Sequence, residues 1–103
     1  MKPWLGVVKV LIEIPGAGNL KDRRQVVRSL CERIKKHFNA SCSDLGPDAV
    51  WNRADIAVCC VGSSCNEISA RVEQICSFVD RAGDDGGFLI TDMEHEVLAY
   101  GDF

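Results

Sequence analysis

The residues that could do the most evident chemistry are cations gathered in "GNLKDRRQVVRSLCERIKKHF" (Gly18 to Phe38). Between Lys21 and His37, seven Lys and Arg residues stand against two acidic residues, a net charge of +5, while the rest of the chain carries −8. Clustered Lys and Arg side chains are typical of surfaces that contact phosphate groups. The alternative is that they form only the charged, solvent-facing side of a helix.

Position along this predicted helix separates the two explanations. Lys35 to His37 fall in the last turn, where the helix dipole favours cations by roughly 0.3–1 kcal/mol each. Lys21, Arg23 and Arg24 fall in the first two turns, where the same dipole disfavours positive charge. A glycine loop that leads into a cation-rich helix N-terminus can bind phosphate. Otherwise, these side chains extend into solvent or pair with distant acids.

At 100° per residue, a basic stripe runs beside the apolar face of this helix: Lys21, Arg24, Arg28 and Lys35, interrupted by Glu32. We therefore predict a nucleic-acid or anion-binding site formed by Lys21, Arg23, Arg24 and Arg28, with Arg53 as an addition. Trp51 and Arg53 could stack on an unpaired base, although a loop Trp more often closes the end of a core. We favour the core role for Trp51.

The six cysteines are Cys31, Cys42, Cys59, Cys60, Cys65 and Cys76. They form no C-x-x-C motif and no Cys-His cluster with metal-ligand spacing, so no metal and no cofactor is expected. Free Cys commonly behaves as a small buried hydrophobe. We expect reduced thiols in or near the core, with a disulfide, metal or redox role as the minor alternative.

Enzymatic motifs are weak. The chain has neither G-x-x-x-x-G-K-[ST] nor G-x-G-x-x-G, and "HEVLA" around His95 lacks the second His of a zinc peptidase. His95 is expected at the rim or in the core. Gly16, Gly18, Asn19 and Arg23 offer only a loose parallel to the phosphate loop of acylphosphatases. We therefore expect no enzymatic activity.

The elements that must position the basic stripe follow from hydropathy patterns. Alternation from Leu5 to Ile14 predicts a strand with Val8, Val10, Ile12 and Ile14 on one face. Asn19 is the predicted N-cap of a helix that carries apolar residues at helical spacing as far as Phe38. Residues 39–44 predict a short second strand.

The second half of the chain repeats this order. Ala54 to Gly62 predicts a buried strand, and the S-x-x-E capping box at Ser64 starts a helix that is expected to stop at Gly83. After a predicted turn at "DDGG", Phe88 to Leu98 forms the last strand, with Leu89, Met93 and Val97 facing inward. The result is a ferredoxin-like βαββαβ fold: a four-stranded antiparallel sheet with two helices on one face and its other face open.

Composition agrees with one domain of residues 1–103. With 47% hydrophobic and 26% charged residues, the chain is typical of a globular protein. The longest apolar runs are too short to span a membrane, and we find no cleavable signal, so a cytoplasmic location is expected.

The segments "IPGAGNLKDRRQVVRSLCERIKKHFNAS" and "WNRADIAVCCVG" resemble the YlxP-like family of small bacterial proteins, over about Leu5 to Leu98. This resemblance implies a ferredoxin-like fold. The genes of that family commonly lie among genes for translation initiation and ribosome maturation, which implies an RNA or ribosome partner by association.

We therefore expect a non-enzymatic module that binds RNA or the ribosome through its basic helix. The acidic last strand would repel RNA, since residues 80–103 carry a net charge of −6. One alternative is a homo-oligomeric interaction module, such as a homodimer through the open sheet face or a sheet edge. A phosphate-handling enzyme of the acylphosphatase kind is the remaining alternative.

Overall fold

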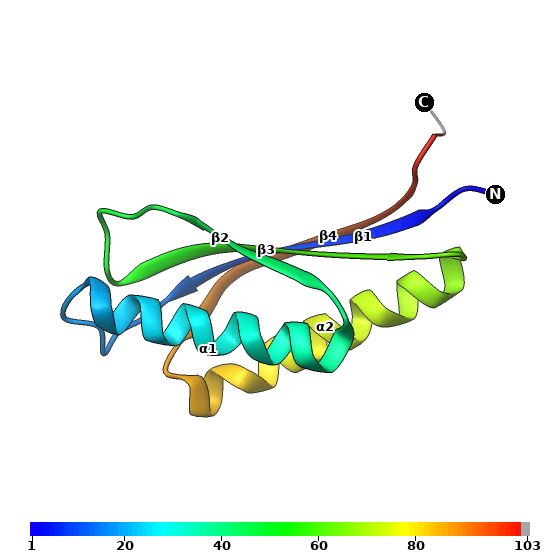
Figure 1. Ribbon diagram of the computed structural model, residues 1–103. Coiled ribbons are helices and arrows are strands. Elements are labelled where there is room, and N and C mark those ends of the chain that lie inside the picture. The colour runs from blue at the N-terminus through cyan, green and yellow to red at the C-terminus, as the bar shows by residue number, and fades with distance from the viewer. Residues whose placement is uncertain (102–103) are drawn as a thin grey trace.

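A computed structural model describes residues 1–101 and has the expected βαββαβ order (Figure 1). Its elements are β1 (Trp4–Glu13), α1 (Leu20–Phe38), β2 (Ser41–Gly46), β3 (Arg53–Gly62), α2 (Cys65–Gly86) and β4 (Leu89–Ala99). The strands form one antiparallel sheet in the order β2-β3-β1-β4. Figure 1 shows both helices on the same side of this sheet. The ferredoxin-like fold predicted from the sequence is confirmed.

Strand alternation produces the core between the sheet and the helices. Val8, Val10, Ile12 and Ile14 are each at most 1% exposed, as their period-two spacing predicts. They pack with alternate residues of β3 and with the apolar stripes of both helices. The helix-facing side of the sheet is therefore dry, and the opposite side is left open.

The helix ends follow local capping chemistry. Asn19 caps α1 by accepting a hydrogen bond from the Asp22 amide at 2.9 Å, and Ser64 caps α2 in the same way through the Glu67 amide. The expected stop of α2 at Gly83 and the turn at "DDGG" are wrong, because the helix continues to Gly86. It ends where Gly87 adopts φ 76°, the left-handed conformation that favours glycine.

The last strand differs from its predicted phase in its first half. A β-bulge shifts its register with β1 between Leu11 and Ile12, so that Ile90 rather than Leu89 lies against the core. Leu89 is 58% exposed, which corrects its inward assignment. His95, expected at the rim or in the core, is also exposed. Residues 39 and 40 precede β2 instead of starting it, because Asn39 ends α1 in a left-handed conformation.

No helix within residues 1–101 has both the length and the apolar character needed to cross a membrane.

Candidate nucleic-acid interface

A groove between α1 and β2 carries most of the predicted basic stripe. Arg24, Arg28 and Lys35 of α1 line this groove, whose volume is about 390 Å³. All three are exposed, as is Lys21 near the start of the same helix. Their spacing of three, four and seven residues brings them to one side of the helix. We call Lys21, Arg24, Arg28 and Lys35 the basic stripe.

The stripe is free of internal ion pairing. Among residues 1–101, none of its four side chains forms a hydrogen bond or ion pair with another residue. Glu32 and Asp44 also line the groove, so the positive field there is partly offset. Two of the three groove-lining cations, Arg24 and Arg28, lie four residues apart, where like charges repel by a few tenths of a kcal/mol. An anion bound between them would relieve that repulsion.

The N-terminus of α1 is less open to an anion than its sequence suggests. The Asp22 carboxylate accepts a hydrogen bond from the Gly18 amide at 3.0 Å, while Asn19 accepts one from the Asp22 amide. Protein side chains thus already satisfy two of the amides that a phosphate could use. The candidate surface accordingly lies along the side of α1 rather than at its tip.

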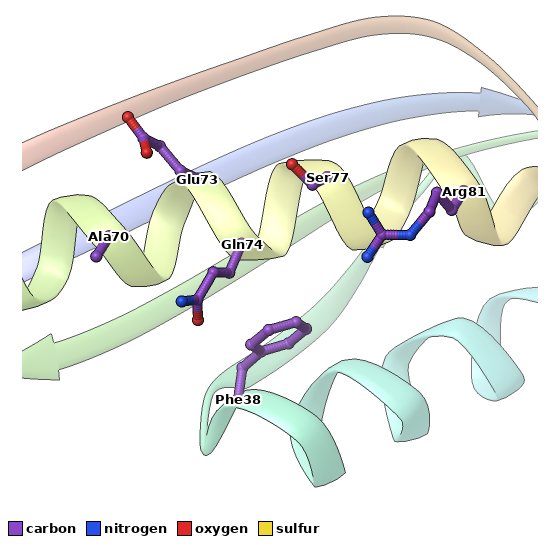
Figure 2. A pocket seen from close by; sticks show the side chains of 6 residues that line it. All are labelled: Phe38, Ala70, Glu73, Gln74, Ser77 and Arg81. Carbon is purple, nitrogen blue, oxygen red and sulfur yellow. The ribbon is translucent and has the colours of Figure 1, made fainter.

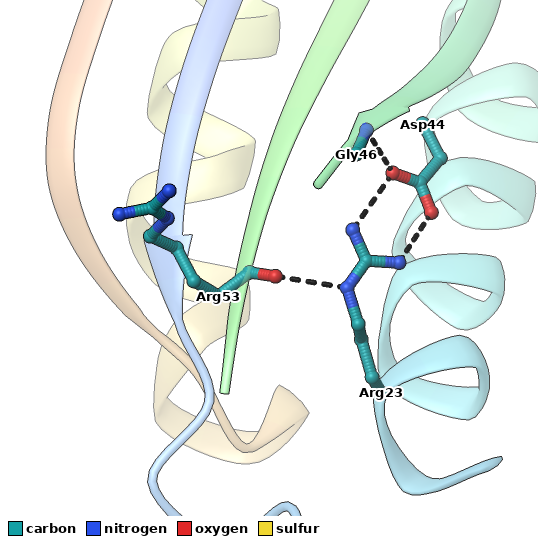
Figure 3. A network of polar contacts seen from close by, with 4 residues as sticks. All are labelled: Arg23, Asp44, Gly46 and Arg53. Atoms are coloured by element: carbon teal, nitrogen blue, oxygen red, sulfur yellow. Dashed lines mark hydrogen bonds and ion pairs between the residues drawn. The ribbon is translucent and has the colours of Figure 1, made fainter. Parts of the chain in front are cut away.

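Arg23 requires a correction. It was predicted to contact phosphate, but it is only 2% exposed and each of its three guanidinium nitrogens donates a hydrogen bond within the protein. Nη1 and Nη2 donate to the two carboxylate oxygens of Asp44 at 2.7 and 3.0 Å, and Nε donates to the Arg53 carbonyl at 2.8 Å (Figure 3). Arg23 therefore joins α1 to β2 and β3, and it is not available to a ligand. For the same reason, Arg23 cannot serve as the phosphate-binding arginine in the comparison with acylphosphatases.

Electrostatics agree with this structural role. The hydrogen bonds from Arg23 lower the pKa of Asp44, and the Gly46 amide, which donates to the same carboxylate at 2.8 Å, contributes in the same direction. The hydrogen bond with Asp44 raises the pKa of Arg23, which stays protonated. The Arg23–Asp44 ion pair therefore connects α1 to β2 at one end of the sheet.

Arg53 and the basic stripe lie on different faces. Figure 3 shows the Arg53 carbonyl directed toward Arg23 and its side chain directed away. Arg53 alternates with the buried Ala54, so its exposed side chain lies on the open face of the sheet. Trp51 is 48% exposed, which corrects its expected role in closing the core. Arg53 and Trp51 could take part only in a second contact area, separate from α1.

The C-terminal part of α1 uses its charge for packing against α2. Arg33 lies 5.0 Å from the ring centroid of Phe78 and 3.5 Å from the Asp85 carboxylate. His37 contacts the Arg33 carbonyl through Nδ1 at 2.8 Å, as expected for a residue in the last helical turn. These groups explain part of the positive charge of α1 without a ligand.

A second hollow, of about 470 Å³, lies beside these packing contacts (Figure 2). Phe38 lines it from the end of α1, and the other lining residues, Ala70, Glu73, Gln74, Ser77 and Arg81, come from α2. Its lining includes one acid, Glu73, and one base, Arg81. Ser77 lies four residues after Glu73 on the same helix, and no hydrogen bond joins the two side chains within residues 1–101. The hollow offers no charge arrangement comparable with the basic stripe.

The six cysteines differ in burial: Cys31 and Cys60 are buried, and Cys42 and Cys76 are half-buried. Cys59 and Cys65 are exposed, contrary to their expected place in or near the core. Cys31 of α1 and Cys42 of β2 both line the groove, and their Sγ atoms are 2.9 Å apart. The thiol of Cys42 donates to Cys31, and this hydrogen bond lowers the pKa of Cys31 and raises that of Cys42. The spacing of the cysteines in the sequence did not indicate this pair, because the two residues come together only when α1 packs against β2.

Comparison with known proteins supports the sequence resemblance. Residues 5–93 match the model of a family described as protein of unknown function (DUF503). The uncharacterized protein YlxP of Bacillus subtilis (strain 168) is 30% identical over 64 residues, which cover 62% of this chain and 70% of that protein.

Two solved structures resemble the fold at low sequence identity. A C-terminal segment of the alpha subunit of aIF2 from Pyrococcus abyssi has a TM-score of 0.48 and 12% identity, over 96% of this chain and 52% of that one. The chain thus spans about half the length of the archaeal segment. A NIPSNAP family protein from Agrobacterium tumefaciens has a TM-score of 0.41 and 18% identity, over 96% and 95% of the two chains.

The family match covers most of the chain, including β1, α1 and β3, which carry the sequence resemblance. The chain belongs to the DUF503 family.

Proposed function

We propose that this protein binds RNA, free or within the ribosome, through the basic stripe of α1, and that it catalyses no reaction. The observation that carries the proposal is a set of four exposed cations without ion-pair partners among residues 1–101, on an otherwise acidic chain. When unpaired Lys and Arg side chains contact phosphates, the counterions condensed on the RNA are released, which drives binding without sequence specificity. A cytoplasmic location is part of this proposal.

The distribution of charge also orients the proposed complex. On the open sheet face, Glu94 and Glu96 of β4 lie beside Lys9 and Val7 of β1. These acids disfavour a phosphate backbone on that face. RNA would therefore approach from the helix side, along the groove between α1 and β2.

The test is a fluorescence-anisotropy titration with ribosomal RNA fragments over a series of KCl concentrations. Four contacts with single-stranded RNA predict a log–log salt slope of roughly −3, from about 0.7 per contact. The variant Arg24→Gln/Arg28→Gln removes two contacts and should bring the slope to about −1.5.

Arg81→Gln is the matched control, since it removes an exposed arginine from α2, away from the groove. It should leave both affinity and slope close to those of the wild type. The proposal fails if the wild-type protein binds no RNA, or if Arg81→Gln weakens binding as much as the paired change in α1.

The open sheet face favours a second candidate function, homo-oligomeric association. Leu5 and Val7 of β1 lie in register with Val61 and Cys59 of β3 on this face, and Val61 is 58% exposed. Light scattering over a concentration series tests association, and Val61→Glu should abolish it if this face is the contact. A mass that stays monomeric at all concentrations excludes this candidate.

A further inference from the structure

The groove contains a pair of thiols that the proposed RNA contact does not use. Cys31 lies on the inner side of α1 and is 8% exposed. Cys42 lies in β2 opposite the buried Val58 of β3, so its side chain faces the helices. The two Sγ atoms are 2.9 Å apart, although the residues are separated by eleven positions. A disulfide S–S bond of about 2.05 Å would need an approach of only about 0.9 Å.

The surroundings of the pair favour reaction with a small oxidant. Both thiols line the open groove, where Cys42 is half-buried and Cys31 is 8% exposed, so hydrogen peroxide would reach them through this groove. Arg24, Arg28 and Lys35 line the same groove, and positive charge nearby favours a thiolate. Glu32 and Asp44 of the same lining act in the opposite direction. Reactive cysteines are typically found in partly exposed, electropositive surroundings beside a second, resolving Cys.

The hydrogen bond assigns the two roles. The Cys42 thiol donates and Cys31 accepts, so the hydrogen bond favours the thiolate form at Cys31 rather than at Cys42. Lowering of the pKa of Cys31, first by Cys42 and further by Lys35, agrees with this assignment. Cys42, whose pKa is raised, keeps its proton until the second step.

We infer that Cys31 and Cys42 form a peroxide-reactive dithiol, in which hydrogen peroxide oxidises Cys31 and Cys42 resolves the product to a disulfide between α1 and β2. The Cys31 thiolate attacks one peroxide oxygen, the O–O bond breaks, and the leaving hydroxide takes up the proton that the Cys31 thiol had released to solvent, which gives water. Cys31 is then a sulfenic acid. Cys42 sulfur attacks the Cys31 sulfur, the S–O bond breaks, and the Cys42 proton leaves with the hydroxyl group as a second water.

The electrons balance in this sequence. Each sulfur loses one electron to form the S–S bond, and the two peroxide oxygens gain the two electrons that the sulfurs lose. The product ties α1 to β2 across the floor of the groove, and a dithiol reductant reverses it. The inference goes beyond the proposed function and does not depend on RNA binding.

The test uses the fully reduced, folded chain, treated with hydrogen peroxide at increasing molar ratio. After quenching, the protein is unfolded, its free thiols are alkylated, and its peptides are mapped by mass spectrometry. The thiol count should fall from six to four, and a Cys31–Cys42 linked peptide should appear with a mass loss of about 2 Da for the two hydrogens. Dithiothreitol should restore six thiols.

Two controls keep the result specific. Cys59 and Cys65 are exposed, so they report reaction that depends on access alone. The same treatment in 8 M urea, a concentration chosen to unfold the chain, should abolish the preference for the Cys31–Cys42 pair. In Cys42→Ser, dimedone should label Cys31, because the sulfenic acid then has no resolving thiol.

The inference is overturned if Cys59 or Cys65 is modified while Cys31 and Cys42 remain alkylatable, or if other pairings dominate. Absence of a dimedone adduct in a folded Cys42→Ser variant contradicts the roles assigned to the two sulfurs. The mapping of the wild-type chain decides the main point even if that variant does not fold.

Discussion

Replacement of Arg23 by Met should strongly destabilise the fold. Arg23 is 2% exposed and donates three hydrogen bonds, two to the Asp44 carboxylate and one to the Arg53 carbonyl. Removing one partner of a fully buried ion pair costs about 3–5 kcal/mol. The Asp44 side chain is 31% exposed and keeps its hydrogen bond from the Gly46 amide, so water can compensate in part. We therefore expect a loss of about 2–3 kcal/mol in the free energy of unfolding.

Urea unfolding followed by circular dichroism measures this loss. For a domain of this size, it corresponds to a fall in Tm of roughly 10–20 °C. Arg24→Met is the matched control, because Arg24 is exposed and unpaired within residues 1–101, and its free energy of unfolding should stay within about 0.5 kcal/mol of the wild type. A double-mutant cycle with Asp44→Asn should give a coupling energy of about 2 kcal/mol.

Two results would refute this reasoning. One is a loss below about 0.5 kcal/mol for Arg23→Met, since surface changes typically fall in that range. The other is additivity of Arg23→Met and Asp44→Asn, which would mean that the two groups do not interact in solution. Either result would return Arg23 to the set of cations that could contact a ligand.

Three other perturbations test the structure around the site. The free energy of unfolding should fall as the pH drops below about 4, because the pKa of Asp44 is lower in the folded than in the unfolded chain. The stability that this difference contributes is present above the unfolded-state pKa and is lost as the pH falls through the folded-state pKa. The fall should be smaller in Asp44→Asn. Gly6→Ala should cost about 1–3 kcal/mol in urea unfolding, because its Cβ would lie 2.5 Å from Val72, whereas Gly16→Ala meets nothing within 4 Å and should be nearly neutral. Asn19→Ala should cost about 1 kcal/mol through loss of the α1 cap, and equal stability by the same measurement would contradict the capping role.

Patterns that depend on burial of a whole face were predictable from the sequence. Val8, Val10 and Ile12 are apolar at every second position, and only a strand places such residues on one face. The N-caps of both helices were also predictable, since Ser64 and Glu67 form a full S-x-x-E capping box and Asn19 with Asp22 forms a weaker version of it. The alternation and the capping residues can each be recognised within a short stretch of sequence.

The burial of Arg23 was indicated by its position in the sequence, although its positive charge suggested exposure. Arg23 precedes Val27 by four residues and Leu30 by seven, so it lies on the apolar stripe of α1 rather than beside it. Its partner Asp44 lies 21 residues away in β2. The sequence could thus indicate burial of Arg23, whereas the choice of partner depends on how α1 packs against the sheet.

The bulge in β4 and the thiol pair were beyond the reach of sequence patterns. The phase set by Met93 and Val97 extends to Leu89 only if the strand is regular, and the bulge near Thr91 breaks that regularity. The Thr91 hydroxyl donates to the Leu11 carbonyl at 3.0 Å at this point. Similarly, Cys31 and Cys42 each fit an apolar pattern, and only the packing of α1 on β2 brings their sulfurs together.

The seven cations of α1 serve different purposes, and this division favours a rigid binding surface. Arg23 joins the first half of the helix to β2 and β3, and Arg33 joins the second half to α2. Arg24 and Arg28, which lie between these anchors, have Cβ atoms about 5–6 Å apart on the helix surface. A helix fixed at both ends holds this spacing before any ligand arrives, which lowers the entropy cost of binding. Arg23 thus contributes to the proposed binding surface by fixing the position of the basic stripe, although its own guanidinium is buried and paired.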